Sequence, residues 1–171
     1  VNKENIKKWL LVNTGFDLLK QQHIVDRYFK TIKKLEITND KKGLDFFIEK
    51  PFKIDKKKLP VDIEKPYIAW VVGASYKNKR LSTKQIIKVC NQLNQTILLL
   101  GGNQDFLFAQ KIILETKNKQ VFNLCGKHTL KESSLLVKKS QLVLTNDTGL
   151  MHIASAFKKK IISFWGCTKP S

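Results

Sequence analysis

The sequence predicts an α/β protein with a doubly wound, parallel, Rossmann-like sheet. From residue 67 to residue 171, short apolar runs alternate with amphipathic segments of helical period, which gives five expected strands and four expected helices. The apolar runs are nearly continuous, which is typical of strands buried on both faces between two layers of helices. Residues 1–66 do not follow this alternation, and we expect a helix and a linker there.

The expected elements follow one another with short turns between them. Two of the helices begin with the spacing of a capping box, Ser82 with Gln85 and Thr129 with Glu132. The expected strands cover residues 67–75, 96–102, 120–126, 141–147 and 160–166, and the expected helices cover residues 82–95, 103–118, 129–140 and 148–158.

The N-terminal part has a different pattern. Residues 15–37 carry apolar side chains at three- and four-residue steps, which predicts an amphipathic helix. The following segment to Pro66 is charged and is interrupted by Pro51 and Pro60, as is typical of a linker or a sheet edge. Within it, "LDFFIE" (residues 44–49) has the pattern of one short strand.

The net charge is +18, from 32 Lys and Arg against 14 Asp and Glu. Such an excess fits a nucleic acid, an anionic membrane surface or a phosphorylated substrate, and it equally fits a solvated surface of biased composition. The lysines are scattered, whereas a nucleic-acid groove would interleave them with aromatic residues. We therefore expect no specific nucleic-acid partner and keep peripheral contact with an anionic membrane as an alternative.

The cysteines and the apolar runs indicate the cellular compartment of the protein. Cys90, Cys125 and Cys167 are odd in number and form no CxxC pair, so we expect no metal site and interpret them as small buried residues of a reducing compartment. No apolar run reaches membrane-spanning length and no secretory signal opens the chain. These features favour a cytoplasmic protein, and the lack of an initial Met indicates a piece of a longer one.

Polar turns gather where the expected strands end. In doubly wound sheets, ligands bind beyond the carboxyl ends of the strands, so these turns form one survey of candidate residues. The turns at the opposite edge are short solubilising segments. The carboxyl-end turns read "GASYKNKR", "GGNQD", "CGKHT", "NDTGLMH" and "GCTKP".

The turn "NDTG" opens the helix expected at residues 148–158. Helix N-termini attract phosphate, Gly149 allows close backbone approach, and Thr148 can cap the helix or donate to a phosphate oxygen. Asp147 would repel phosphate, so it orders the turn, binds a hydroxyl or a cation, or serves as the N-cap. His152, one turn further on, either bonds a ligand or is a structural residue.

The turns after the first two strands add further candidates. Lys79 and its basic neighbours could neutralise phosphate charge, or belong to a solvated loop. Gln104 could bond a ribose hydroxyl or a base edge, and Asp105 could merely cap a helix. Gly101 and Gly102 indicate either close backbone approach or an ordinary strand-to-helix turn.

Four stretches taken together resemble a known family. They are "GASYKNKRLSTKQ", "LLLGGNQD", "NLCGKHTLKE" and "LTNDTGLMHIASAF…IISFWGCTKP". In order and spacing they are similar to the C-terminal half of the heptosyltransferase family (glycosyltransferase family 9), which builds the inner core of bacterial lipopolysaccharide. The segment "QHIVDRYFKTIKKLEI" resembles the part of that family just before the interdomain linker.

The resemblance implies a GT-B fold, two Rossmann-like domains of which the C-terminal one binds the nucleotide sugar, usually ADP-heptose. It implies that Lys79 contacts the diphosphate, although Leu81 and Ser82 stand where the family usually carries Trp-Pro. Gln104 falls where some members have a Glu that holds the ribose. The substrate-binding residues that the resemblance implies are Ser75, Lys79, Gln104, Leu130, Asp147, Thr148, Gly149 and His152, with Leu130 at the base pocket and Ser75 near the phosphates.

The implied function is that of a glycosyltransferase, which transfers a heptose or related sugar from an ADP-sugar to a lipid-anchored lipopolysaccharide core acceptor. Residues 67–171 would be the donor-binding domain, and residues 1–66 the tail end of an absent N-terminal domain that carries the general base. The final helices are also absent, so the chain alone would be inactive. The ADP-sugar is a substrate, so no cofactor is expected, and the location would be cytoplasmic, at the inner face of the membrane. The alternatives are a non-catalytic nucleotide-binding module and, from charge alone, a nucleic-acid-binding protein.

Overall fold

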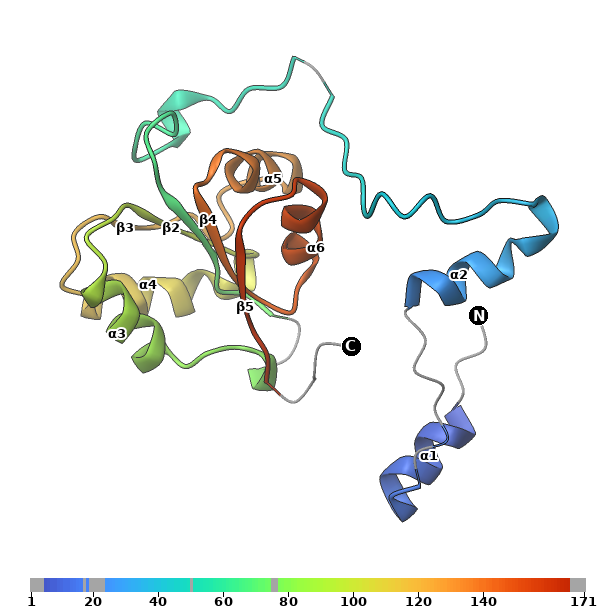
Figure 1. Ribbon diagram of the computed structural model, residues 1–171. Coiled ribbons are helices and arrows are strands. Elements are labelled where there is room, and N and C mark those ends of the chain that lie inside the picture. Colours follow the sequence, from blue (N-terminus) through green and yellow to red (C-terminus); the bar gives the residue numbers. More distant parts are fainter. Residues whose placement is uncertain (1–4, 17, 19–23, 50, 75–76, 167–171) are drawn as a thin grey trace. The chain divides into compact units, whose positions relative to one another are not determined.

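The computed structural model describes residues 5–16, 18, 24–49, 51–74 and 77–166. The chain divides into two compact units, one within residues 1–43 and the other within residues 44–170 (Figure 1). No helix in the described part of the chain is both long enough and apolar enough to cross a membrane.

The described residues of the first unit form two helices, α1 (Asn5–Thr14) and α2 (Ile24–Thr31), and α2 is followed by a 3-10 turn at Lys33–Leu35. The single helix expected at residues 15–37 is therefore only partly formed. Gly15, with φ of +75°, ends α1 in a conformation that a continuing helix does not allow. Residues 17 and 19–23 of the expected helix lie outside the described residues.

The second unit is built on a five-stranded parallel sheet with the strand order β3-β2-β1-β4-β5. All five strands fall inside the expected runs, so the prediction of the parallel sheet is confirmed. The expected short strand at residues 44–49 is wrong, because these residues pair with no strand of the described sheet. The strands are β1 (Ile68–Val71), β2 (Ile97–Leu100), β3 (Val121–Asn123), β4 (Leu142–Asn146) and β5 (Ile161–Phe164).

Four helices cover the two faces of this sheet, as a doubly wound fold requires (Figure 1). Helices α3 (Thr83–Gln92) and α4 (Phe106–Glu115) pack on one face, and α5 (Leu130–Lys139) and α6 (Gly149–Ala156) on the other. A 3-10 turn at Asn103–Asp105 leads into α4. The capping boxes expected at the starts of α3 and α5 are both present.

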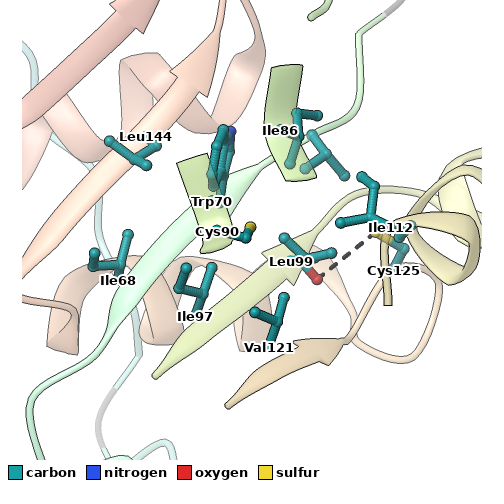
Figure 2. Packing of buried hydrophobic residues seen from close by; sticks show 12 residues of the cluster. Ile68, Trp70, Ile86, Cys90, Ile97, Leu99, Ile112, Val121, Cys125 and Leu144 are labelled. Carbon is teal, nitrogen blue, oxygen red and sulfur yellow. Dashed lines mark hydrogen bonds between the residues drawn. The ribbon is translucent and has the colours of Figure 1, made fainter. Parts of the chain in front are cut away.

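The larger core cluster lies between the sheet and the α3–α4 layer. Figure 2 shows Trp70 of β1 together with Ile86 and Cys90 of α3, all fully buried. Cys90 and Cys125 are buried free thiols. Burial raises the pKa of Cys90 to about 11 and that of Cys125 to about 12, so both behave as small apolar residues. Cys167 lies outside the described residues.

The segment before β1 also contributes to the second core cluster, on the α5–α6 face. Ile54 is buried there, and Leu59, Val61 and Ile63 pack against the same cluster. A 3-10 turn at Lys56–Lys58 begins with an N–H of Lys57 donated to the Asp55 carboxylate at 3.0 Å. Residues 54–63 thus lie along the domain as a covering segment.

Candidate functional site

A cavity of about 380 Å³ opens at the carboxyl ends of the strands. It is formed by the turns after β1, β2 and β4 and by the beginning of α5. Four residues that the family resemblance implies as donor contacts, Gln104, Leu130, Thr148 and Gly149, contribute to its wall. The other described residues of the wall are Val71, Gly73, Ala74, Gly101, Gly102, Asp105, His128, Ser133 and Leu150.

A larger cavity of about 640 Å³ lies between residues 52–64 and α5. Its charged side chains include Lys139 and Glu64, which form an ion pair with each other. It contains none of the residues expected to bind the donor, and it lies away from the carboxyl ends of the strands. We therefore place the candidate site in the smaller cavity.

An ion pair lies beside the smaller cavity, at the point where the strand order reverses. The ammonium group of Lys79, in a 3-10 turn at Lys77–Lys79, donates to Asp147 Oδ2 at 2.6 Å. Lys79 follows β1 and Asp147 follows β4, and these two strands are neighbours in the sheet. Both side chains are 22% exposed, so water still reaches the pair. Asp147 thus forms an ion pair with a lysine of the same chain.

The start of α6 adjoins this ion pair. Thr148 occupies the N-cap position with an extended backbone, and among the described residues no side chain caps the helix. The Thr148 hydroxyl lies 3.4 Å from that of Thr145. The positive end of the α6 dipole therefore lies at the wall of the cavity, next to the ammonium of Lys79.

The glycines of the cavity wall differ in how much space surrounds them. A Cβ at Gly73 would lie 2.3 Å from Asp105 Oδ2, and a Cβ at Gly101 would lie 2.9 Å from the same atom. A Cβ at Gly149 would have nothing within 4 Å among the described residues. Packing against Asp105 therefore explains Gly73 and Gly101, whereas the space beside Gly149 is open.

Asp105 is a residue whose importance sequence reasoning missed. It is 2% exposed, and its Oδ2 accepts the N–H of Gly102 at 3.0 Å. Its Oδ1 lies 3.4 Å from Nη1 of Arg80. The spacing of an acid after two strand-end glycines was the available signal, but it does not reveal which basic residue the acid contacts.

Asn146 holds the ends of β1 and β4 together. It is 1% exposed, and its Nδ2 lies 3.3 to 3.4 Å from the carbonyl oxygens of Val71, Val72 and Gly73. The amide thus bridges the place where the two strands diverge. It fixes the base of the turn that carries Asp147.

His128 is a second buried titratable residue in this region. Its side chain is 0% exposed, and neither ring nitrogen has a hydrogen-bond partner among the described residues. Its Nδ1 lies 3.8 Å from Glu132 Oε2, which is too long for a hydrogen bond. Burial lowers the pKa of His128 and Glu132 acts in the opposite direction, so the imidazole is held neutral.

Four residues expected at the site are not among the described residues that line the cavity, and two of them, Lys79 and Asp147, form the ion pair beside it. His152 is exposed on α6 and is not among the described residues of the wall. Ser75 lies outside the described residues. No cluster of three or more His, Cys, Asp or Glu that could hold a metal ion occurs in the described part of the chain.

The parallel strand order and the cavity at its reversal point define an α/β domain of the Rossmann-like class. The sequence model of glycosyltransferase family 9 (heptosyltransferase) matches residues 3–171. The chain belongs to this family.

Curated relatives are longer than this chain. Lipooligosaccharide heptosyltransferase 2 of Campylobacter jejuni (serotype O:6) is 32% identical over 159 residues, which are 88% of this chain and 49% of the relative. The Haemophilus influenzae protein of the same name is 32% identical over 114 residues, 63% of this chain and 33% of the relative. The chain thus spans at most about half the length of these two relatives.

Solved structures share the fold. The glycosyl transferase family 9 protein of Veillonella parvula superposes with a TM-score of 0.71 at 19% identity, over 88% of this chain and 46% of that one. The E. coli heptosyltransferase WaaC with ADP-2-deoxy-2-fluoro heptose gives a TM-score of 0.63 at 20% identity, over 91% and 49%. These likenesses support the Rossmann-like fold found in GT-B heptosyltransferases.

Proposed function

We propose that this chain is the donor-binding part of a glycosyltransferase. The complete enzyme would transfer a heptose, or a related sugar, from an ADP-sugar to a lipopolysaccharide core acceptor. Family membership supports the reaction class, and a solved structure of the same fold is of a heptosyltransferase with ADP-2-deoxy-2-fluoro heptose. The general base would come from a part of the enzyme outside residues 1–171.

One observation carries the proposal: the Lys79 ammonium lies beside an α6 start that no described side chain caps. A nucleotide sugar brings a diphosphate, which needs a cation and several N–H donors. Lys79 and the N–H groups of Thr148 and Gly149 would supply them. The cavity next to this point is open over Gly149, where a ligand can approach the backbone.

The chemical step that this arrangement supports is a direct displacement. A hydroxyl oxygen of the acceptor forms a bond to the anomeric carbon, and the bond from that carbon to the diphosphate oxygen breaks. The acceptor proton passes to the general base, and the electron pair leaves with ADP. Lys79 and the α6 amides would stabilise the negative charge that develops on the leaving diphosphate.

The remaining wall residues suit the nucleoside. Leu130 is 62% exposed at the start of α5 and would provide an apolar surface for the base. Gln104 lies in the cavity wall beside Gly102 and would bond the ribose. Ser75 and His152 stay predicted donor contacts. The reaction would take place in the cytoplasm, at the inner membrane face where a lipid-anchored acceptor is available.

Titration of the 171-residue chain with ADP tests the proposal. We expect binding by calorimetry and expect Lys79→Met to weaken it about tenfold or more, because a hydrogen bond between charged groups is worth about 1.5–3 kcal/mol. Lys84→Met removes the same charge from an exposed position on α3 and should leave ADP affinity unchanged. Wild-type affinity in the Lys79 variant would contradict the assignment.

A further inference from the structure

We infer that Arg80 and Asp105 are positioning residues, an anchor that fixes Lys79 where it meets the diphosphate of the donor. The inference rests on the proposed function and adds to it two residues that need not touch the ligand. The anchor consists of the Arg80–Asp105 ion pair and the ring of Phe108. It holds the turn that carries Lys79 against α4.

The acidic half of the anchor is fixed from several directions. Asp105 is 2% exposed, and one of its oxygens already accepts the N–H of Gly102 at 3.0 Å. Its carboxylate also packs against the backbone at Gly73 and Gly101, which leaves no room for a Cβ at either position. Asp105 therefore presents its other oxygen to Arg80 from a rigid site at the ends of β1 and β2.

The basic half of the anchor is immobilised as well. The guanidinium of Arg80 lies 3.4 Å from Asp105 Oδ1, and its central carbon is 4.6 Å from the centroid of the Phe108 ring. This combination of an ion pair and stacking suits the planar guanidinium and not a lysine ammonium. The Arg80 side chain is 20% exposed, so the pair is largely shielded from solvent.

Lys79 is the residue directly before Arg80, so the anchor acts on its backbone. On another side, a Cβ at Gly166 would lie 2.1 Å from the Asn78 carbonyl oxygen and 3.4 Å from the Lys79 Cα. The turn is thus held by Gly166 after β5 and by the anchor at α4. From this fixed backbone the Lys79 ammonium reaches Asp147 at 2.6 Å.

Two alternatives make different predictions. Of the described residues, Asp105 contributes to the cavity wall and Arg80 does not. If Asp105 acted only through its charge, its carboxylate would repel a diphosphate and Asp105→Asn would tighten ADP binding. If the pair acts through Lys79, the same substitution weakens ADP binding, because Arg80 loses its fixed partner and the turn loosens. The sign of the change therefore separates the two.

The test is calorimetric titration of the 171-residue chain with ADP and with AMP. We expect Asp105→Asn and Arg80→Gln each to weaken ADP binding about fivefold or more, while AMP affinity stays within about twofold. In a Lys79→Met background, neither substitution should weaken ADP binding further. As a control, Glu115→Gln removes an acid from the exposed Lys111–Glu115 pair on α4 and should change neither ADP affinity nor AMP affinity.

Urea unfolding shows which variants are folded, and Arg80→Gln reports on the anchor if Asp105→Asn does not fold. Tighter or unchanged ADP binding in the folded Arg80 and Asp105 variants would overturn this inference and leave the proposed function standing. So would a loss of ADP affinity that persists in full without Lys79. If the wild-type chain binds no ADP, the proposed function fails together with the inference.

Discussion

Helices α5 and α6 lie on the same face of the sheet, yet they begin differently. At α5, the Thr129 hydroxyl accepts the Glu132 N–H at 3.2 Å, and Glu132 accepts the Thr129 N–H at 2.8 Å. At α6, no described side chain caps the helix, and the adjacent Asp147 carboxylate binds Lys79. A helix that caps itself contributes to stability, whereas the amides of α6 stay available to a ligand.

The comparison predicts that the hydroxyl at the α6 start serves binding. Thr148→Val keeps the branched shape and removes only the hydroxyl group. We expect ADP affinity to fall about tenfold, since a hydrogen bond to a charged group is worth about 1.5 kcal/mol or more. The free energy of unfolding should change by less than about 0.5 kcal/mol. Calorimetry measures ADP affinity and urea titration measures stability. A Thr148→Val variant that loses stability but not ADP affinity would show that this hydroxyl serves stability and not binding.

The equivalent residue of α5 should show the opposite behaviour. Thr129→Ala removes a side-chain cap, so we expect a loss of about 1 kcal/mol in the free energy of unfolding. ADP affinity should stay at the wild-type value. Thr129→Ser retains the hydroxyl and should recover most of the stability. An ADP affinity that falls with Thr129→Ala in parallel with stability would show that the start of α5 also serves binding.

Gly149 allows a finer test of the α6 start. A Cβ there meets no described atom within 4 Å, so Gly149→Ala should leave the chain at least as stable, with a gain of up to about 0.5 kcal/mol. If a ligand approaches this backbone closely, the same methyl group should weaken ADP binding a few-fold. Thermal unfolding with and without ADP measures both. Equal stabilisation by ADP in the variant and the wild type would argue against close approach.

The smallest expected effect concerns pH and the beginning of α5. Burial lowers the pKa of His128 below 6.5, so the unfolded state binds more protons than the folded state just below pH 6.5. Stability should therefore fall as the pH drops from about 6.5 toward the folded-state pKa. Glu132, whose pKa is lowered mainly by the Thr129 N–H, loses its contribution only at pH below 4.5.

Urea unfolding at pH 7.5 and pH 5.5 measures this dependence. His128→Phe keeps a ring in the buried position and removes the titrating group, so its stability should change less between the two pH values. The same pH dependence in wild type and variant would assign the effect to another residue.

The sheet, the helices around it and both capping boxes could be predicted because their signals are local. Apolar runs, helical period and the Ser82–Gln85 and Thr129–Glu132 spacings all lie within a few residues. The gathering of the polar turns at one edge followed from the parallel topology. The apolar period predicted one helix over residues 15–37, but Gly15, Phe16 and Leu18 are not helical and the described α-helix in this range is Ile24–Thr31.

Long-range partners lay beyond sequence reasoning. The sequence pattern indicated Lys79 and Asp147 as separate candidates. Only the fold brings Lys79 Nζ to 2.6 Å from Asp147 Oδ2. Asp105 looked like a helix cap, and its contact with Arg80 depends on how α4 packs beside the turn after β1. His152 shares the motif of Thr148, but it is exposed on α6 and is not among the described residues of the cavity wall.

The Lys79–Asp147 pair joins positions that are 68 residues apart in the chain. A contact between residues this far apart in the sequence requires the closure of a long loop, which is slow. We therefore expect the candidate cavity, whose wall comes from turns far apart in the sequence, to be lost when the domain unfolds globally. A nucleotide that bridges these turns should therefore slow proteolysis of the whole domain, and not of one loop alone.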